Sequence, residues 1–182
     1  MCERELDALD LTINVKKSCC LRIGARNNVV CQPLYSMSGT SLPWVTEIKY
    51  LGIHIVNSKS FKITTEQSRR HFYRAANAIF SRIGRIATEE VILHLLCTKC
   101  MPILLYGLEA CPMRKSDLNS LDFVVNRFFM KLFRTGDINI VKSCQSFFSF
   151  NLPSVLIKNR AEKFDIKYKN HDNMLCQMVK YL

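Results

Sequence analysis

The spacing of apolar residues changes near residue 60, and this change limits the folds that the chain can adopt. In the first third, apolar and polar residues alternate, which is the pattern of half-buried β-strands. This alternation predicts strands at residues 11–15, 19–23, 29–35 and 50–56, with a turn at 24–28. After Phe61 the apolar residues recur every three or four positions, as in amphipathic α-helices. The sequence therefore predicts an α+β fold, in which a short strand-rich part precedes an α-helical bundle.

Boundary signals place the helices along the second part. Thr64 and Gln67 have the spacing of a capping box, and Thr88 precedes an acidic first turn. Pro102 is expected to kink or break the second helix, because proline lacks the amide hydrogen that an interior helical residue donates. The other predicted boundaries are a helix start at Ser116, a C-terminal cap at Gly136, a shorter segment near 138–148, a first turn at Pro153 and a short or frayed helix from Met174.

Basic residues are concentrated in one part of the chain. The 182 residues carry 26 Lys and Arg against 15 Asp and Glu, for a formal net charge of +11. Residues 11–85 alone hold 12 bases and two acids, Glu47 and Glu66, for a net charge of +10. A local positive field of this size favours a polyanionic partner, most often nucleic acid, over an anionic membrane surface.

The sequence carries no signal for export or membrane insertion. No apolar run reaches the roughly 18 residues that a membrane-spanning helix needs. Residues 1–10 are acidic, unlike a secretory signal. We therefore expect an intracellular protein without a membrane partner, with the nucleus and the cytoplasm both open. In such a compartment the nine cysteines are expected to be reduced, and most of them to be small core residues.

Residues that could support catalysis or bind a metal do not form a recognisable cluster. The only adjacent acidic pair, Glu89 and Glu90, suits the first turn of a helix. Cys97 and Cys100 have the CxxC spacing, but no second CxxC or HxxxH pair accompanies them, so core cysteines are favoured over a zinc or redox site. The residues alone thus predict a basic domain without a complete active site and without a metal centre.

Three segments resemble the reverse transcriptases of non-LTR (LINE-like) retrotransposons. Residues 11–18, LTINVKKS, resemble the N-x-x-K-[S/T] strand that follows the catalytic centre of the polymerase palm. Residues 44–53, WVTEIKYLGI, resemble the hairpin known as the primer grip. Residues 60–134, above all PILLYGLE at 102–109, resemble the thumb that follows. The order of these segments makes the resemblance specific, and it covers residues 1 to about 135.

The resemblance implies a division of the chain into three parts. Residues 1–60 would be the end of the palm with the primer-grip hairpin, residues 61–136 a thumb-like helical bundle, and residues 137–182 an unassigned helical extension. The family's catalytic centre uses two adjacent aspartates and a third on an earlier strand to hold two metal ions. This chain has no Asp-Asp pair. We therefore expect the catalytic hairpin to lie upstream of Met1, Mg²⁺ to belong only to the full-length enzyme, and the chain alone not to polymerise.

The resemblance also implies roles for single residues. Lys17 matches the family lysine that resembles a general acid for pyrophosphate, although without the aspartates no catalytic residue is expected here. Tyr50, Leu51 and Gly52 would form the primer grip, where Gly52 lets the primer backbone approach; a simple strand bulge is the alternative. The arginines that would contact the nucleic-acid backbone are Arg69, Arg70, Arg74, Arg82 and Arg85, with a solvated helix face as the alternative.

Three hypotheses remain open at this point. The first is a truncated reverse transcriptase that binds an RNA/DNA template–primer duplex weakly and whose partner is the missing upstream part of the polymerase. The second is a repurposed, non-catalytic nucleic-acid-binding module. The third is a relic or interaction protein that folds poorly, because a palm without its other strands leaves an open sheet edge and exposed apolar surface. The sequence leaves the oligomeric state open.

Overall fold

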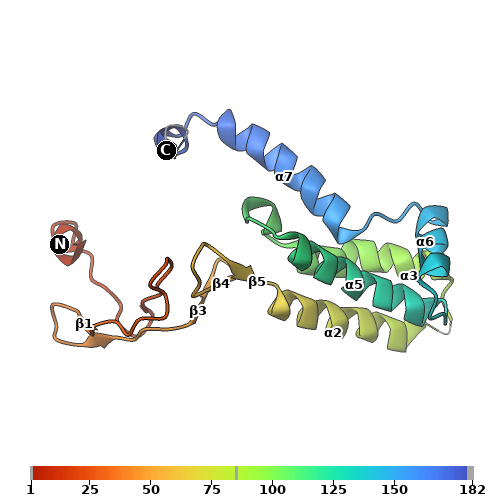
Figure 1. Cartoon of the computed structure of the whole chain (residues 1–182), viewed down its shortest axis with the longest axis horizontal. Coiled ribbons are helices and arrows are strands. Elements are labelled where there is room, and N and C mark those ends of the chain that lie inside the picture. The colour runs from red at the N-terminus through yellow and green to blue at the C-terminus, as the bar shows by residue number, and fades with distance from the viewer. Residues whose placement is uncertain (1, 85, 180–182) are drawn as a thin grey trace. The chain divides into compact units, whose positions relative to one another are not determined.

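The computed structural model describes residues 2–84 and 86–179 (Figure 1). The chain forms two compact units, residues 1–64 and 65–182. The elements of the first unit are α1 (Cys2–Asp7), β1 (Leu34–Tyr35), β2 (Ser41–Leu42), β3 (Glu47–Tyr50), β4 (Ile53–Val56) and β5 (Ile63–Thr64). Those of the second are α2 (Glu66–Ile83), α3 (Glu89–Leu95), the π-helix η1 (Leu96–Cys100), α4 (Met101–Leu105), the 3₁₀-helix η2 (Leu108–Ala110), α5 (Lys115–Leu132), α6 (Ile138–Phe147), α7 (Pro153–Lys169) and α8 (Met174–Val179). Strands followed by helices confirm the predicted α+β class.

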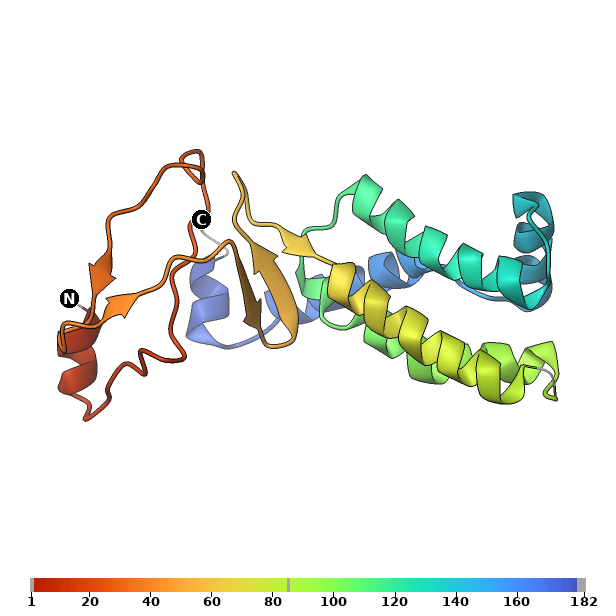
Figure 2. The same ribbon diagram turned by 90° about the horizontal axis from the view of Figure 1, so that it is seen from below.

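The strands of the first unit pair locally. β1 and β2 form an antiparallel hairpin, and β3, β4 and β5 form an antiparallel sheet in that order (Figure 2). Each connection within a sheet is short, so every strand pairs with its neighbour in sequence. The longest ladder joins β3 to β4 over four residue pairs, from Glu47 opposite Val56 to Tyr50 opposite Ile53.

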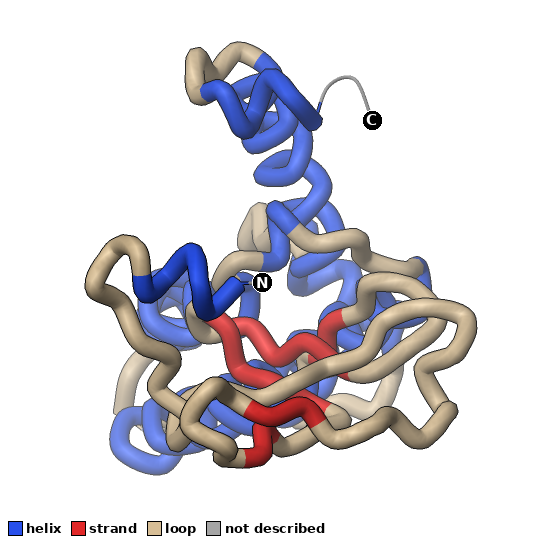
Figure 3. Tube along the Cα trace, turned by 90° about the vertical axis from the view of Figure 1, so that its left-hand side faces the viewer, coloured by secondary structure: helices blue, strands red, loops and turns tan. Residues whose placement is uncertain are grey.

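Two of the predicted strands, residues 11–15 and 19–23, are wrong. Both segments are loops, and most of the chain between α1 and β3 is drawn as loop in Figure 3. Only isolated bridges form there, one between Cys20 and Trp44 and one between Ile23 and Ser58. A strand needs a partner with free backbone groups over several consecutive residues, but residues 19–23 find only two single-residue bridges and residues 11–15 find none. Alternation of apolar residues therefore does not suffice for a strand.

The other two strand predictions are correct in part. Of residues 29–35, only Leu34–Tyr35 forms a strand, directly after Pro33, which cannot donate to a ladder. Residues 41–42 pair with it. The run at residues 50–56 is the turn and second strand of a hairpin, so Gly52 lies in the turn and the strand-bulge alternative is wrong.

The first unit buries little apolar surface. Among its described residues, Ile63 is the only buried hydrophobic side chain, whereas Val30 is 94% exposed. Polar contacts tie the loops instead: Nδ2 of Asn27 donates to Oδ1 of Asn57 over 2.8 Å, which holds the turn after residue 23 against the end of β4. Because apolar burial is the main stabilising term in folding, this unit gains little of it from its own residues.

The second unit has a continuous core between its helices. α2 contributes Phe72 and Ala76 to this core, as the predicted stripe requires. α5 has a broad apolar face, whose buried residues are Leu121, Val124, Val125, Phe128 and Phe129. Polar contacts fix α5 to the next helices: the side-chain amide of Gln145 in α6 donates to Asn126 over 2.7 Å. Side-chain hydrogen bonds also join α5 to α2, where the candidate site lies.

Helix α2 begins one residue later than the capping-box prediction places it. Thr65 is the N-cap residue, and its side chain makes no capping hydrogen bond. The predicted Thr64–Gln67 capping box is therefore wrong. The next helix matches its prediction better, since Thr88 is the N-cap of α3 and Glu89 and Glu90 occupy the first turn.

Pro102 does not break the helix that contains it. The chain passes from α3 through η1 into α4 without interruption, and the amide of Met101 donates to the carbonyl of Leu96, five residues earlier. This wider π-type turn lies directly before Pro102, whose nitrogen has no hydrogen to donate, and the helix continues past the proline. The predicted break is thus replaced by a local change of hydrogen-bond pattern.

The C-terminal end of α5 differs from its prediction. Gly136 is the predicted cap, but Arg134 adopts the left-handed conformation, with φ of +51°. The amide of Thr135 donates to the carbonyl of Met130 over 3.0 Å, which is the hydrogen bond of a Schellman cap. The helix ends at Leu132, and Arg134, a residue with a side chain, takes the strained position.

The prediction that most cysteines lie in the core is also wrong. Of the eight cysteines whose side chains are described, all are free thiols and only Cys100 is buried. Cys97 is exposed, although it lies in the same π-helix as the buried Cys100. The Cys19–Cys20 pair lies in the loop after residue 18 and not in a strand.

Candidate nucleic-acid interface

The residues singled out from the sequence belong to both units. Lys17, Tyr50, Leu51 and Gly52 lie in residues 1–64, whereas the arginines of α2 lie in residues 65–182. Arg85 lies outside the residues that the structure describes.

The hairpin tip of β3 and β4 has an unusual backbone. Leu51 and Gly52 form its two-residue turn with φ of +47° and +87°, the combination that a type I′ turn requires. Glycine tolerates this conformation, but in leucine it costs about 1 kcal/mol. Tyr50 and Leu51 are 62% and 73% exposed, so packing within the chain does not hold either side chain in place.

Lys17 lies in a turn and not on a strand. Its amide donates to the carbonyl of Asn14 over 2.9 Å, which closes the turn, and its side chain is exposed. Asn14 and Lys17 of the N-x-x-K-S segment are thus the two ends of one turn.

The four described arginines of α2 differ in their surroundings. Arg70 forms an ion pair with Glu66 one turn earlier. Arg74 and Arg82 are exposed and have no ion pair within the described residues. Arg69 is half-buried, and its Nη1 donates to Oγ of Ser120 in α5 over 2.9 Å.

Helix α5 places two further bases, Arg127 and Lys131, beside α2. Figures 1 and 2 show α2 and α5 side by side within the second unit. Between them lies a groove of about 410 Å³ whose lining includes Tyr73, Asn77, Arg127 and Lys131. Nζ of Lys131 donates to Oδ1 of Asn77 over 2.8 Å and lies 4.7 Å from the centroid of the Phe80 ring. These contacts hold the ammonium group at the rim of the groove.

The charges around this groove act on Tyr73. Burial raises the pKa of the Tyr73 hydroxyl, and the nearby positive charges of Arg127 and Arg69 oppose that rise. The hydroxyl therefore stays protonated at neutral pH and can donate a hydrogen bond at the groove.

Of the two acids in the basic stretch, only Glu66 neutralises a base of this surface, Arg70. Oε1 of Glu47 lies 2.5 Å from Nδ1 of His54 across the β3–β4 hairpin, and Glu66 pairs with Arg70. Arg74, Arg127 and Lys131 have no acidic partner within the described residues. We call the surface formed by Arg69, Arg70, Tyr73, Arg74, Asn77, Arg127 and Lys131 the α2–α5 basic face.

Sequence reasoning missed the half of this face that belongs to α5. Arg127 and Lys131 are four residues apart, so they share one side of a helix. That spacing was a usable signal for a basic row. It did not reveal that the row lies beside α2, because helix pairing depends on packing between segments distant in sequence.

The described part of the chain offers neither a metal centre nor a membrane-spanning helix. Among residues 2–84 and 86–179, no three His, Cys, Asp or Glu side chains gather closely enough to hold a metal ion. Over the same residues, no helix combines the length and the apolar character needed to cross a bilayer.

Comparisons of the chain with protein-family models, with curated proteins and with solved structures find no match.

Proposed function

We propose that this chain is the template–primer-holding part of a reverse transcriptase of the non-LTR retrotransposon type, and that it binds nucleic acid without polymerising it. The α2–α5 basic face holds the phosphate backbone of an RNA/DNA duplex. The hairpin tip at Tyr50, Leu51 and Gly52 meets the primer strand. With nucleic acid as the partner, the chain acts inside the cell, in the nucleus or the cytoplasm.

One observation carries this proposal: bases of α2 and α5 gather on one face, and the two from α5, Arg127 and Lys131, line the groove between the helices. Arg74 of α2 and Arg127 of α5 have no acidic partner within the described residues, and Lys131 is held at the groove rim by Asn77. Phosphate contacts supply most of the affinity for nucleic acid, and they require cations that are free to displace counterions. A helix face that only contacts water would not require bases from two helices on the same surface.

The strained hairpin tip gives separate support. Leu51 occupies a backbone conformation that suits glycine or asparagine, and its side chain is 73% exposed. Conformational cost without any gain from burial points to a contact outside the chain. A primer backbone and sugar edge passing over the tip would cover this leucine.

In this proposal the chain supplies no catalytic residue. The lysine at position 17 fits the family's general acid only when the aspartates that hold Mg²⁺ are present, and this chain has no Asp-Asp pair. Mg²⁺ is accordingly a cofactor of the full-length enzyme, and primer extension by this chain alone would contradict the proposal.

The proposal is tested by fluorescence anisotropy with a labelled RNA/DNA template–primer. The test variant is Arg74→Gln, Arg127→Gln and Lys131→Gln combined. Removing one phosphate contact should lower the affinity close to tenfold near 0.1 M salt. The matched control is Lys142→Gln, Lys158→Gln and Lys163→Gln combined, which removes the same charge from exposed positions of α6 and α7.

The control separates a site from a general charge effect. We expect the test variant to lose most of the binding while the control keeps it. Equal loss in both variants would contradict a specific face, and no binding by the unmodified chain at low salt would overturn the proposal. Equal affinity for a blunt duplex and a recessed primer end would instead favour the non-catalytic binding module.

A further inference from the structure

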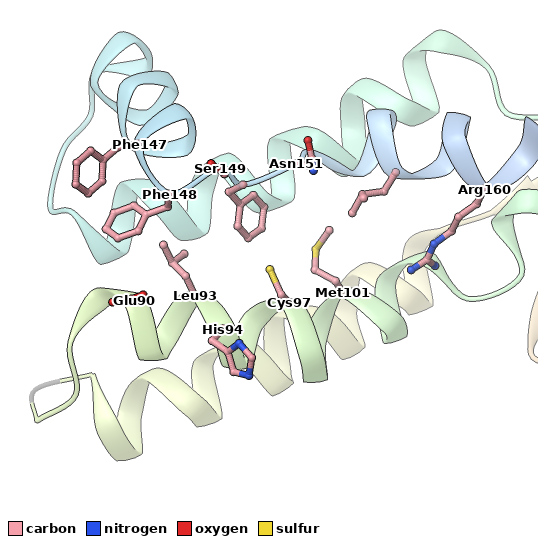
Figure 4. Close-up of a pocket in the computed structure, with 12 residues that line it drawn as sticks. Glu90, Leu93, His94, Cys97, Met101, Phe147, Phe148, Ser149, Asn151 and Arg160 are labelled. Atoms are coloured by element: carbon pink, nitrogen blue, oxygen red, sulfur yellow. The ribbon is translucent and has the colours of Figure 1, made fainter.

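A second groove lies on another side of the helical unit, away from the residues of the α2–α5 basic face. It has a volume of about 740 Å³ and runs between the α3–η1–α4 helix and the segment that joins α6 to α7 (Figure 4). Its volume is in the range of pockets that bind ligands. Residues Glu90, Leu93, His94, Cys97 and Met101 form one wall, at the spacing of a single helix face.

The groove is apolar inside and bordered by an exposed aromatic ring. Leu93 and Met101 of one wall face Phe148, Phe150 and Leu156 of the other. Phe147 lies at one end, and its side chain is 83% exposed. Exposing a phenylalanine to that extent beside an apolar groove forgoes the favourable burial that the ring would gain against a partner.

Opposite charges occupy the two ends of the groove. Glu90 lies in the first turn of α3, at the same end as Phe147, and Arg160 of α7 lies beyond Met101 at the other end (Figure 4). Neither side chain has an ion pair within the described residues. About 16 Å of helix separates Glu90 from Met101, at 1.5 Å per residue.

We propose that the occupant of this groove is a second copy of the chain, related by a two-fold axis. Two copies placed antiparallel across the groove set Glu90 of each against Arg160 of the other. The same operation places each Phe147 over the far end of the opposite groove, beside Met101 and Leu156. One surface therefore supplies both the projecting ring and the cavity, both the acid and the base, which is the self-complementarity that a closed two-fold interface requires.

The position of Cys97 provides a way to crosslink the proposed dimer. Figure 4 shows its sulfur directed into the groove between the two charged ends. A residue near the middle of an antiparallel interface lies close to its own copy across the axis. The two Cys97 thiols are accordingly neighbours in the dimer, and each can add to one end of a short bismaleimide, forming one S–C bond at each maleimide double bond.

The test is a charge exchange followed by light scattering, without nucleic acid. The unmodified chain should show a concentration-dependent change from one to two copies and none beyond. Glu90→Arg sets two positive charges together at both ends of its own dimer, and Arg160→Glu sets two negative charges together there, so each variant should be monomeric. In an equimolar mixture, a dimer with one copy of each variant carries opposite charges at both ends of the interface. One end has the original acid and base, and the other has the two signs exchanged. This mixed dimer should therefore form.

Controls exclude unfolding and general charge effects. The same reversals at exposed neighbours that do not line the groove, Glu89→Arg and Lys158→Glu, should leave the dimer intact. Phe147→Ala removes an exposed ring, so it should leave the thermal melt unchanged while weakening the dimer about tenfold or more. Cys97→Ser should reduce crosslinked dimer to the level that Glu90→Arg gives.

Three results would overturn the proposal. They are a single copy at all concentrations up to roughly 0.1 mM, a dimer that both charge reversals leave intact, and a failure of the mixed variants to associate. The first result would mean that a second copy of the chain does not occupy the groove.

Discussion

Nη1 of Arg69 donates a hydrogen bond of 2.9 Å to Oγ of Ser120, and this contact joins α2 to α5 at the edge of the α2–α5 basic face. Nε of the same guanidinium is buried and has no partner within the described residues. Arg69 thus positions two helices as well as adding charge, which distinguishes it from its neighbours on α2.

The first prediction concerns this contact. Ser120→Ala removes the acceptor of a charged donor that is already short of partners, so we expect the free energy of unfolding to fall by about 1–2 kcal/mol. Urea denaturation measures the change. Ser116→Ala, on the exposed first turn of the same helix, is the control and should change stability by about 0.5 kcal/mol or less. Equal effects in both variants would mean that the Arg69 contact contributes nothing.

The second prediction concerns the acid on the basic face. Glu66 pairs with Arg70, so Glu66→Gln should release this arginine and raise the net charge of the face by one. We expect affinity for a nucleic-acid duplex to rise several-fold at low salt, and the rise to shrink as salt is added. Because the pair is exposed, stability should change by about 0.5 kcal/mol or less. Unchanged or weaker binding would show that Arg70 does not contact the ligand.

The third prediction concerns the end of α5. Arg134→Gly should raise the free energy of unfolding by about 0.5–1 kcal/mol, because glycine adopts φ of +51° without the strain that a side chain causes. Gly136→Ala should be nearly neutral, since an added Cβ there meets no atom within 4 Å. Thermal melts compare the two variants. Destabilisation by Gly136→Ala together with no gain from Arg134→Gly would restore Gly136 as the cap.

The fourth prediction concerns alkaline pH. Burial raises the pKa of the Cys100 thiol from 9.0 to about 11. The native state therefore holds this proton more tightly than the unfolded chain, and the resulting stability is present below pH 9 and lost as the pH rises through about 11. In Cys100→Ala the decline between these values should be shallower, although Tyr73, whose pKa is also raised, remains in both proteins. Denaturant melts at about pH 8 and pH 11 measure it, and parallel declines would contradict the assignment.

The sequence was sufficient for features that depend on neighbouring residues. The change of period near residue 60, the apolar face of α5 and the start of α7 at Pro153 all reflect local pattern. Features that depend on distant partners were missed or wrong. The alternation at residues 11–23 suits a strand, but too few residues elsewhere in the unit offer backbone groups to pair with it.

The candidate site divides in the same way. The roles of the α2 arginines were expected from the resemblance to the thumb of a reverse transcriptase. Arg127 and Tyr73 were missed, since their role depends on α2 and α5 lying side by side. The position of Arg134 in place of Gly136 was not predictable either, because it depends on where α5 ends in the folded structure, and the sequence does not give that residue.

The salt dependence of duplex binding tests the central claim most directly. The slope of log K against log salt concentration counts the phosphates that a protein neutralises, at about 0.9 per contact on B-form DNA. With Arg74, Arg127 and Lys131 all changed to Gln, we predict that the slope falls by about two to three units relative to the unmodified chain. The same slope in both proteins would contradict the assignment of this face to nucleic acid.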